Sequence, residues 1–228
     1  MLFWTKRNIL KINTFFFVIF SFFFLCFPEY DITFSNFFFS DGQFLSEKFT
    51  LIKDLRSFFK DFMIFFSIVA FSLLIFFYLL KKIKKKSIFT LRYRLVLLGL
   101  VIGPIIGCGI IANMYFKDTW GRARPAYVNE FGGEKIYTPA FQKSDQCDKN
   151  CSWISGEASA AFSFISGTIL LKNPIFLLIN IFIGFIVSFF RISMGGHFLS
   201  DNIFAMFFMI YLAVIYRYLA LKYLKKYV

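Results

Sequence analysis

Six apolar stretches, each close to the length that crosses a lipid bilayer, constrain the fold of this chain more than any other feature. A helix needs ~20 mostly apolar residues to cross the hydrocarbon layer. The stretches cover residues 9–27, 62–80, 95–116, 155–171, 174–190 and 203–221, and the fourth and fifth are the shortest. Hydrophobic residues make up 58% of the chain, which also separates it from an ordinary soluble domain. We therefore predict an all-α polytopic membrane protein, a bundle of six transmembrane helices that forms one domain over residues 1–228.

Charge is segregated between the segments that connect these stretches, and this predicts the orientation of the helices. With the N-terminus inside, the inner segments contain basic residues only, and all 13 Asp and Glu residues lie on the outer side. Lys and Arg gather in the cytoplasmic loops of membrane proteins, so we expect both termini in the cytoplasm. The net charge of +13 then follows the inner membrane face, and we expect no nucleic-acid partner.

The first outer segment, residues 41–61, carries apolar side chains at helical spacing with Lys and Asp between them. This pattern is typical of an amphipathic helix that lies flat in the membrane interface. We predict such an interfacial helix here. It could pack over the ends of the spanning helices or face a substrate.

Three clusters of polar and charged residues stand at the predicted outer helix ends, where a charge beside a span is costly unless it is paired or functional. Because the helices alternate in direction, all three clusters come to the same side of the membrane and could build one site. The clusters consist of Lys117 and Arg124, of Ser155, Gly156 and Glu157, and of Arg191, His197 and Asp201.

These residue types suit the binding of a phosphate. Lys117, Arg124 and Arg191 offer N–H donors that could hold the oxygens of a tetrahedral anion. Ser155 and Gly156 stand where a helix is predicted to begin, so their backbone N–H groups and the helix dipole would favour an anion. A purely structural cluster of charges is the alternative.

His197 is the only histidine in the chain, and Asp201 follows it four residues later. At that spacing the carboxylate could accept a hydrogen bond from one ring nitrogen and leave the other available as a nucleophile. A lone histidine at a helix end is most often structural, so this pair gains weight only from the cations predicted around it.

The clusters together resemble the three motifs of the type 2 phosphatidic acid phosphatase superfamily. The first motif, Lys-x6-Arg-Pro, matches residues 117–125. The third, Arg-x5-His-x3-Asp, matches residues 191–201, although Phe190 stands where many members have Ser. The resemblance covers residues 95–228, and three motifs in the right order are far more specific than any one of them.

The resemblance implies a phosphatase that needs no metal or other cofactor. In such an enzyme His197 would attack phosphorus and form a phosphohistidine, and Asp201 would orient its ring. The cations Lys117, Arg124 and Arg191 would hold the phosphate.

The second motif departs from the family pattern, which usually reads Pro-Ser-Gly-His, because residues 154–157 read Ile-Ser-Gly-Glu. The family's histidine at this position protonates the leaving oxygen. Glu157 could replace it as general acid if its pKa is raised, whereas the nearby cations would lower that pKa. We predict this acid role, with helix capping or pairing with an arginine as the alternative.

Within the superfamily the chain most resembles bacterial lipid A 4'-phosphatases. The likeness rests on the carboxylate at Glu157, on the Trp-Gly-Arg-x-Arg-Pro form of the first motif and on the Cys147-Asp-Lys-Asn-Cys151 segment. It implies an acylated glucosamine disaccharide as substrate, at the periplasmic leaflet of the bacterial inner membrane. Undecaprenyl pyrophosphate, phosphatidylglycerol phosphate and phosphatidic acid are alternative substrates, and an anion-binding transporter or scaffold is the non-enzymatic alternative.

Cys147 and Cys151 lie in the predicted outer loop, where an oxidising periplasm permits a disulfide. A zinc site is less favoured, because the only histidine is assigned to the phosphate site.

Overall fold

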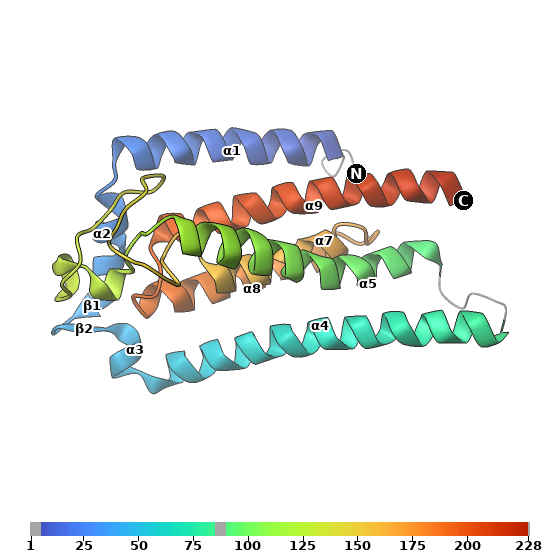
Figure 1. Cartoon of the computed structure of the whole chain (residues 1–228), viewed down its shortest axis with the longest axis horizontal. Helices are drawn as coiled ribbons and strands as arrows, with labels where there is room; N and C mark the ends of the chain where they lie inside the picture. Colours follow the sequence, from blue (N-terminus) through green and yellow to red (C-terminus); the bar gives the residue numbers. More distant parts are fainter. Residues whose placement is uncertain (1–5, 85–89, 228) are drawn as a thin grey trace.

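The computed structural model describes residues 6–84 and 90–227, and it is a bundle of long helices lying side by side (Figure 1). Within these residues, five helical segments are long and apolar enough to cross a membrane. They are Asn8–Cys26, Thr50–Leu80, Leu91–Lys117, Ile175–Ser193 and Leu199–Lys226. The all-α polytopic architecture predicted from the sequence is thereby confirmed.

These segments belong to six elements of the structure. They are α1 (Lys6–Cys26), α4 (Thr50–Lys84), α5 (Leu91–Pro104), its continuation as the π-helix η2 (Ile105–Lys117), α8 (Ile175–Ser193) and α9 (Leu199–Tyr227). The change from α- to π-helical bonding follows Pro104, which has no N–H to donate to the preceding turn.

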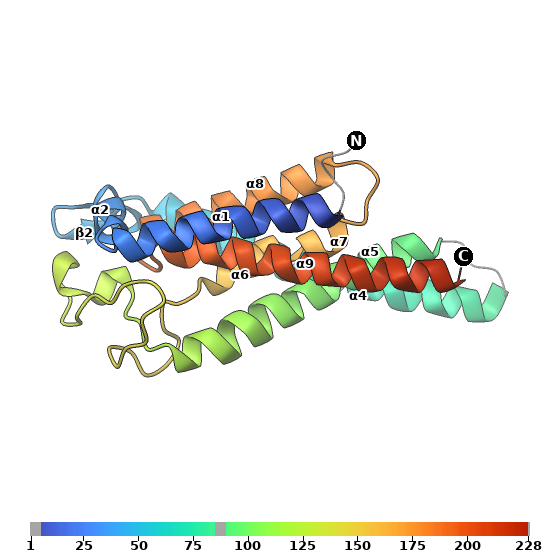
Figure 2. The same cartoon turned by 90° about the horizontal axis from the view of Figure 1, so that it is seen from above.

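The fourth predicted span, residues 155–171, is not one long helix. It forms two short helices, α6 (Gly156–Ser163) and α7 (Ile165–Thr168), which run from one end of the bundle toward the other (Figure 2). Most of its side chains are buried by neighbouring helices. Neither helix alone has the ~20 residues that a crossing needs, so the sixth crossing stays a prediction.

Small residues on α5 and η2 explain how this broken segment fits inside the bundle. Gly99, Gly103 and Gly107 recur every four residues and therefore share one helix face. An added Cβ would lie 2.6 Å from the carbonyl oxygen of Ser166 at Gly99 and 2.3 Å from that of Ser163 at Gly103. The backbones of α5, α6 and α7 therefore approach closely, as small residues allow in membrane bundles.

The outer connections pack across one end of the bundle. They comprise α2 (Tyr30–Asn36), the two-stranded antiparallel ribbon of β1 (Phe39–Ser40) and β2 (Gln43–Phe44), α3 (Leu45–Lys48), and the short 3-10 turns η3 (Pro125–Tyr127) and η4 (Asn129–Phe131). Figure 1 shows α2 lying across the end of α1 at a steep angle.

The amphipathic segment 41–61 does not form the separate interfacial helix predicted for it. Its first part enters the β1–β2 ribbon and α3, and its second part forms the first turns of α4, which continues without a break. The physical reason is that residues 50–84 contain neither Gly nor Pro, so nothing ends the helix between its charged start and its apolar span.

The start of α1 and the end of α9 lie toward the same end of the bundle, and the loops that carry the predicted site lie at the opposite end (Figures 1 and 2). The last turn of α4, whose sequence includes Lys82, lies toward the same end as the start of α1 (Figure 1). The basic ends of the chain and the polar site clusters, which are separate in the sequence, therefore also lie at opposite ends of the folded bundle.

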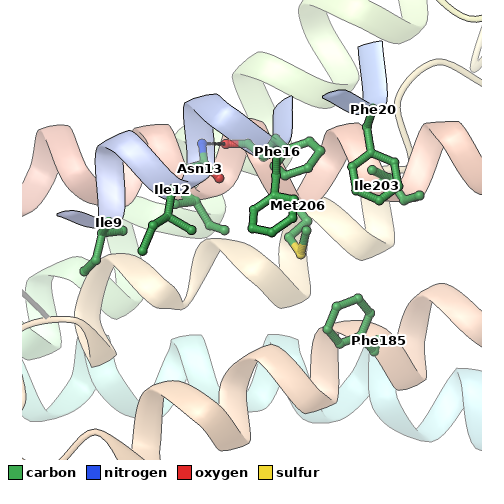
Figure 3. A pocket seen from close by; sticks show the side chains of 10 residues that line it. Ile9, Ile12, Asn13, Phe16, Phe20, Phe185, Ile203 and Met206 are labelled. Carbon is green, nitrogen blue, oxygen red and sulfur yellow. Dashed lines mark hydrogen bonds between the residues drawn. The ribbon is translucent and has the colours of Figure 1, made fainter. Parts of the chain in front are cut away.

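An apolar cavity of about 560 Å³ lies between α1, α8 and α9 (Figure 3). Asn13 supplies a polar group in its lining and donates from Nδ2 to the carbonyl oxygen of Phe207 at 3.3 Å. Phe16 and Phe185, which also line it, are about half exposed on the side of the bundle. This cavity belongs to the lipid-facing flank, away from the clusters of charge.

Candidate active site

The loop between α8 and α9 places His197 between Arg191 in the last turn of α8 and Asp201 in the first turn of α9. The backbone N–H groups of Gly196 and His197 donate to the carbonyl oxygen of Arg191 at 3.0 and 3.2 Å, which folds the loop back over the helix end. A Cβ on Gly196 would lie 2.6 Å from Nη2 of Arg191. The glycine therefore allows the guanidinium to lie against the backbone beside the histidine.

The ring of His197 is fully buried and its orientation is determined by one contact. Nδ1 lies 2.8 Å from the carbonyl oxygen of Ser152. A carbonyl oxygen only accepts hydrogen bonds, so Nδ1 carries the proton of the neutral ring. Nε2 is buried without a hydrogen-bond partner among the described residues. The contact thus leaves a lone pair on Nε2, the arrangement that a nucleophile requires.

Asp201 does not accept the hydrogen bond from His197 that the sequence suggested. Its Oδ2 lies 3.5 Å from Nδ1, beyond normal hydrogen-bond length. The same oxygen accepts from the backbone N–H of Phe198 at 2.8 Å and from the hydroxyl of Ser152. Asp201 therefore holds Ser152 and the loop backbone on either side of the histidine.

The second oxygen of Asp201 is held by Arg122, a residue to which the sequence analysis assigned no role. Nη1 of Arg122 donates to Oδ1 of Asp201 at 2.6 Å, and Nη2 donates to Oδ2 of Asp31 on α2 at 2.7 Å. Further bonds reach Ser200 and the carbonyl oxygen of Thr138, at 2.9 and 2.8 Å. One fully buried guanidinium thus joins α2 to the start of α9 through two carboxylates.

Burial raises the pKa of Asp31, and the positive charge of Arg122 opposes this shift. Burial is costly for a charge unless it is paired and hydrogen-bonded. The network meets that condition, since Asp31 also accepts from the N–H and hydroxyl of Ser200. Its position directly behind Asp201 makes it a support for the site.

Lys117 and Arg124 meet at Asn150, another residue that sequence reasoning missed. Nζ of Lys117 donates to Oδ1 of Asn150 at 3.1 Å, and Nη2 of Arg124 donates to the carbonyl oxygen of Asn150 at 2.7 Å. Asn150 has φ 55°, a left-handed conformation that Asn tolerates better than most residues. It lies in the ring closed by a disulfide between Cys147 and Cys151, whose Cα atoms are 5.6 Å apart.

Glu157 is engaged by arginines. Both of its carboxylate oxygens accept from Arg56 on α4, Oε2 from Nε at 2.8 Å and Oε1 from Nη2. Nη1 of Arg191 lies 3.6 Å from Oε1. Burial alone would raise the pKa of Glu157, but the hydrogen bond from Arg56 and the charge of Arg191 outweigh it, so the pKa is lowered. This geometry matches the arginine-pairing alternative of the sequence analysis, and the acid role stays a prediction.

Ser155 is the N-cap of α6, and its hydroxyl accepts from the N–H of Ala158 at 3.4 Å. Its own N–H donates to the carbonyl oxygen of Asp201 at 3.2 Å and so is not directed at an anion as expected. A Cβ on Gly156 would lie 3.1 Å from Nζ of Lys117. The helix start thus ties α6 to α9 and makes room for the lysine.

The three cations act on His197 through space. Its pKa lies well below the ordinary value, mainly because burial disfavours the charged ring, and further because of the positive charges of Arg191, Lys117 and Arg124. The ring is therefore neutral at neutral pH. The structure brings the predicted residues of all three clusters together at one end of the bundle.

Five supporting residues were not predicted: Asp31, Arg56, Arg122, Asn150 and Ser152. Asp31 could have been suspected as an acidic residue in a Phe-rich segment, and Arg122 as the unassigned arginine between Lys117 and Arg124. Across residues 6–84 and 90–227, no group of three or more His, Cys, Asp and Glu side chains is placed to hold a metal ion.

Comparison with known proteins identifies relatives of this chain. The profile of a family described as "PAP2 superfamily" matches residues 92–224. A lipid A 4'-phosphatase of Francisella tularensis subsp. novicida is 37% identical over 176 residues, which cover 75% of this chain and 76% of that protein. Lipid A 4'-phosphatases of Rhizobium etli and Rhizobium leguminosarum are each 34% identical over 45% of this chain, and the matches cover 40% and 43% of those proteins. No solved structure matches the chain.

Proposed function

Because this chain belongs to the PAP2 superfamily and is a membrane-bound hydrolase of phosphoric monoesters, we propose that its substrate is the 4'-phosphate of lipid A and its nucleophile His197. The substrate is suggested by relatives named for that activity, one of which matches three quarters of the chain. The nucleophile is suggested by the geometry around the imidazole ring.

One observation carries the mechanism: Nε2 of His197 and Nε of Arg191 are both buried without a hydrogen-bond partner among the described residues. Buried polar atoms are rarely left unpaired in folded proteins. A phosphate placed between them would accept from the guanidinium and present phosphorus to the imidazole. Lys117 and Arg124 would hold the remaining oxygens, and the charge that develops there would be stabilised by all three cations.

In the first step the lone pair of Nε2 forms a bond to phosphorus while the bond from phosphorus to the sugar oxygen breaks. The leaving alkoxide takes up a proton from solvent water. The hydrogen bond from Nδ1 to the carbonyl of Ser152 stabilises the positive ring of the phosphohistidine. In the second step water attacks phosphorus, releases inorganic phosphate and returns the neutral ring.

In this scheme solvent water, and not a side chain, supplies the proton to the leaving sugar oxygen. Glu157 was predicted to supply it, but its pairing with Arg56 and its lowered pKa favour a charged carboxylate that holds Arg56 and Arg191 in place. We propose this clamping role for Glu157.

The site is proposed to face the periplasm, with both termini in the cytoplasm of a bacterial inner-membrane protein. Support comes from the basic residues near the terminal end of the bundle and from the site loops at the other end. A Lys82→Cys variant should resist a membrane-impermeant thiol reagent in spheroplasts, whereas Glu134→Cys should react, after Cys26 and Cys108 are replaced. The reverse labelling pattern would place the site in the cytoplasm.

The substrate is tested with the protein purified in detergent. Phosphate release should be fastest from lipid A, compared with undecaprenyl pyrophosphate, phosphatidylglycerol phosphate and phosphatidic acid, and it should survive chelation with EDTA. A folded His197→Ala variant should be inactive, because the covalent step has no other nucleophile. Normal turnover by that variant would refute the mechanism, and a preference for another lipid would refute the substrate.

A further inference from the structure

A second cavity, of about 270 Å³, opens beside the phosphate-binding residues and is distinct from the apolar cavity of Figure 3. Arg124 and Asn150 line it, and the same two residues are bonded to each other at the phosphate site. Asn150 also accepts from Lys117. A group bound in this cavity would therefore be a direct neighbour of the phosphate.

We propose that this cavity is a subsite for the sugar ring that carries the scissile phosphate. It is lined by residues whose side chains suit a hydroxylated ring: the aromatic Tyr127, and the polar Lys135, Asp148 and Lys149. Its volume is close to the lower end of the ~300–1,000 Å³ range of small-molecule sites, which indicates room for one ring and not for a whole lipid. The subsite presupposes the proposed reaction on a sugar phosphate.

The aromatic residue decides between a sugar and a glycerol headgroup. Tyr127 lines the cavity and is 61% exposed. An exposed aromatic ring can stack on the C–H face of a pyranose, and this contact removes apolar surface of both the ring and the sugar from water. The glycerol of phosphatidic acid has no ring to cover that face. The cavity thus favours saccharide phosphates over glycerolipid phosphates.

The walls of the cavity are tied together before any ligand binds. The N–H of Lys135 donates to the carbonyl oxygen of Tyr127 at 2.8 Å, and the N–H of Ile136 donates to the side chain of Gln146 at 2.9 Å. A Cβ on Gly133 would lie 2.1 Å from the carbonyl oxygen of Tyr127, so a glycine is needed for this approach. Preorganised walls lower the cost of binding.

The experiment measures kcat and KM for two soluble substrates, glucosamine 4-phosphate and phenyl phosphate, with the protein in detergent. Tyr127→Ala and Lys149→Ala should each raise KM for the sugar phosphate about tenfold and leave kcat nearly unchanged, as expected for loss of uniform binding. Neither variant should alter the constants for phenyl phosphate, which has no sugar. Tyr127→Phe, which keeps the ring face, should behave as the wild type.

Lys143→Ala is the matched control, since Lys143 lies in the same outer loop but does not line this cavity. Unchanged KM for the sugar phosphate in both cavity variants would overturn the subsite and leave the proposed function intact, provided the wild type still prefers lipid A to phosphatidic acid. A wild type that prefers phosphatidic acid would overturn both. Equal losses on both substrates would assign these residues to the phosphate and also overturn the subsite.

Discussion

Arg56 on α4 donates to both carboxylate oxygens of Glu157 on α6, across 101 residues of sequence. The arginine lies outside residues 92–224, the part matched by the family profile. A helix beyond the matched region therefore contributes a charged side chain to the site. The pair also explains how a carboxylate can stand among the cations that are proposed to bind phosphate.

If Glu157 clamps Arg56 and Arg191, then Arg56→Gln and Glu157→Gln should lower kcat/KM by similar factors, about tenfold each. The double variant should lose little more than either single one, because the two residues act as one unit. The losses should be equal on a sugar phosphate and on an aryl phosphate. Lys60→Gln, one turn further along α4, is the control.

A general acid would give another result for Glu157. Glu157→Gln would then lose ~10²-fold or more on the sugar phosphate, whose leaving group needs a proton, and far less on the aryl phosphate. The lowered pKa of Glu157 argues for the clamp, since the carboxyl then stays charged as pH falls through the ordinary Glu range.

His197 should remain neutral well below the ordinary histidine pKa. Since it is the only histidine, protein labelled with 15N-histidine and purified without a histidine tag shows one imidazole by NMR. We expect Nδ1 to be protonated and Nε2 unprotonated at pH 7, and the ring to titrate only well below its ordinary pKa. Titration near the ordinary value would contradict the burial of the ring.

The lowered pKa of His197 also makes the free energy of unfolding depend on pH. Below the ordinary histidine pKa the unfolded chain binds a proton that the folded protein does not, so the free energy of unfolding decreases as pH falls. This loss ends once the pH falls through the lowered pKa of the folded state. Thermal unfolding in detergent should show this slope in the wild type and lose it in His197→Gln.

Removal of Asp31 should destabilise the protein, although it lies on α2, far from the motifs in sequence. Asp31→Ala leaves Arg122 buried with one carboxylate fewer, and breaking a buried pair costs ~3–5 kcal/mol. We expect a lower unfolding temperature and a lower kcat, because Arg122 also holds Asp201. Asp118→Asn, at an exposed carboxylate on the same side, should change neither quantity. An unchanged unfolding temperature in Asp31→Ala would disprove the supporting role.

We expect Asn150 to support phosphate binding through its side-chain oxygen and its backbone carbonyl oxygen. Asn150→Ala removes the acceptor for Lys117, and reduction of the Cys147–Cys151 disulfide releases the ring that holds the carbonyl for Arg124. Each change should raise KM about tenfold, since correctly placed cations supply the binding energy. Gln142→Ala in the same loop is the control. Full activity of the reduced enzyme would show that the ring is dispensable.

The motif residues could be predicted because their types and spacing report directly on chemistry. Helix direction alone predicts that Lys117, Arg124 and Arg191 share one end of the bundle, and they lie there in the structure, while their role in binding phosphate stays a prediction. Their partners could not be predicted, since Arg56 and Asp31 reach the site through packing of distant helices, which spacing does not encode.

The fourth span shows a similar limit. Its apolar character was visible in the sequence, but its small residues serve close packing against Gly99 and Gly103 and leave a break between two short helices. An apolar run predicts only that its side chains are buried, and both a continuous spanning helix and a broken helix inside the bundle meet that prediction.

If the site faces the periplasm as proposed, closure of the Cys147–Cys151 ring would also determine when the protein becomes able to bind phosphate. A newly made chain has reduced thiols, so the ring that contains Asn150, the residue contacted by Lys117 and Arg124, is still open. With an outward-facing site, oxidation follows only after the loop has left the cytoplasm. Full affinity for phosphate would thus appear only after translocation of the loop.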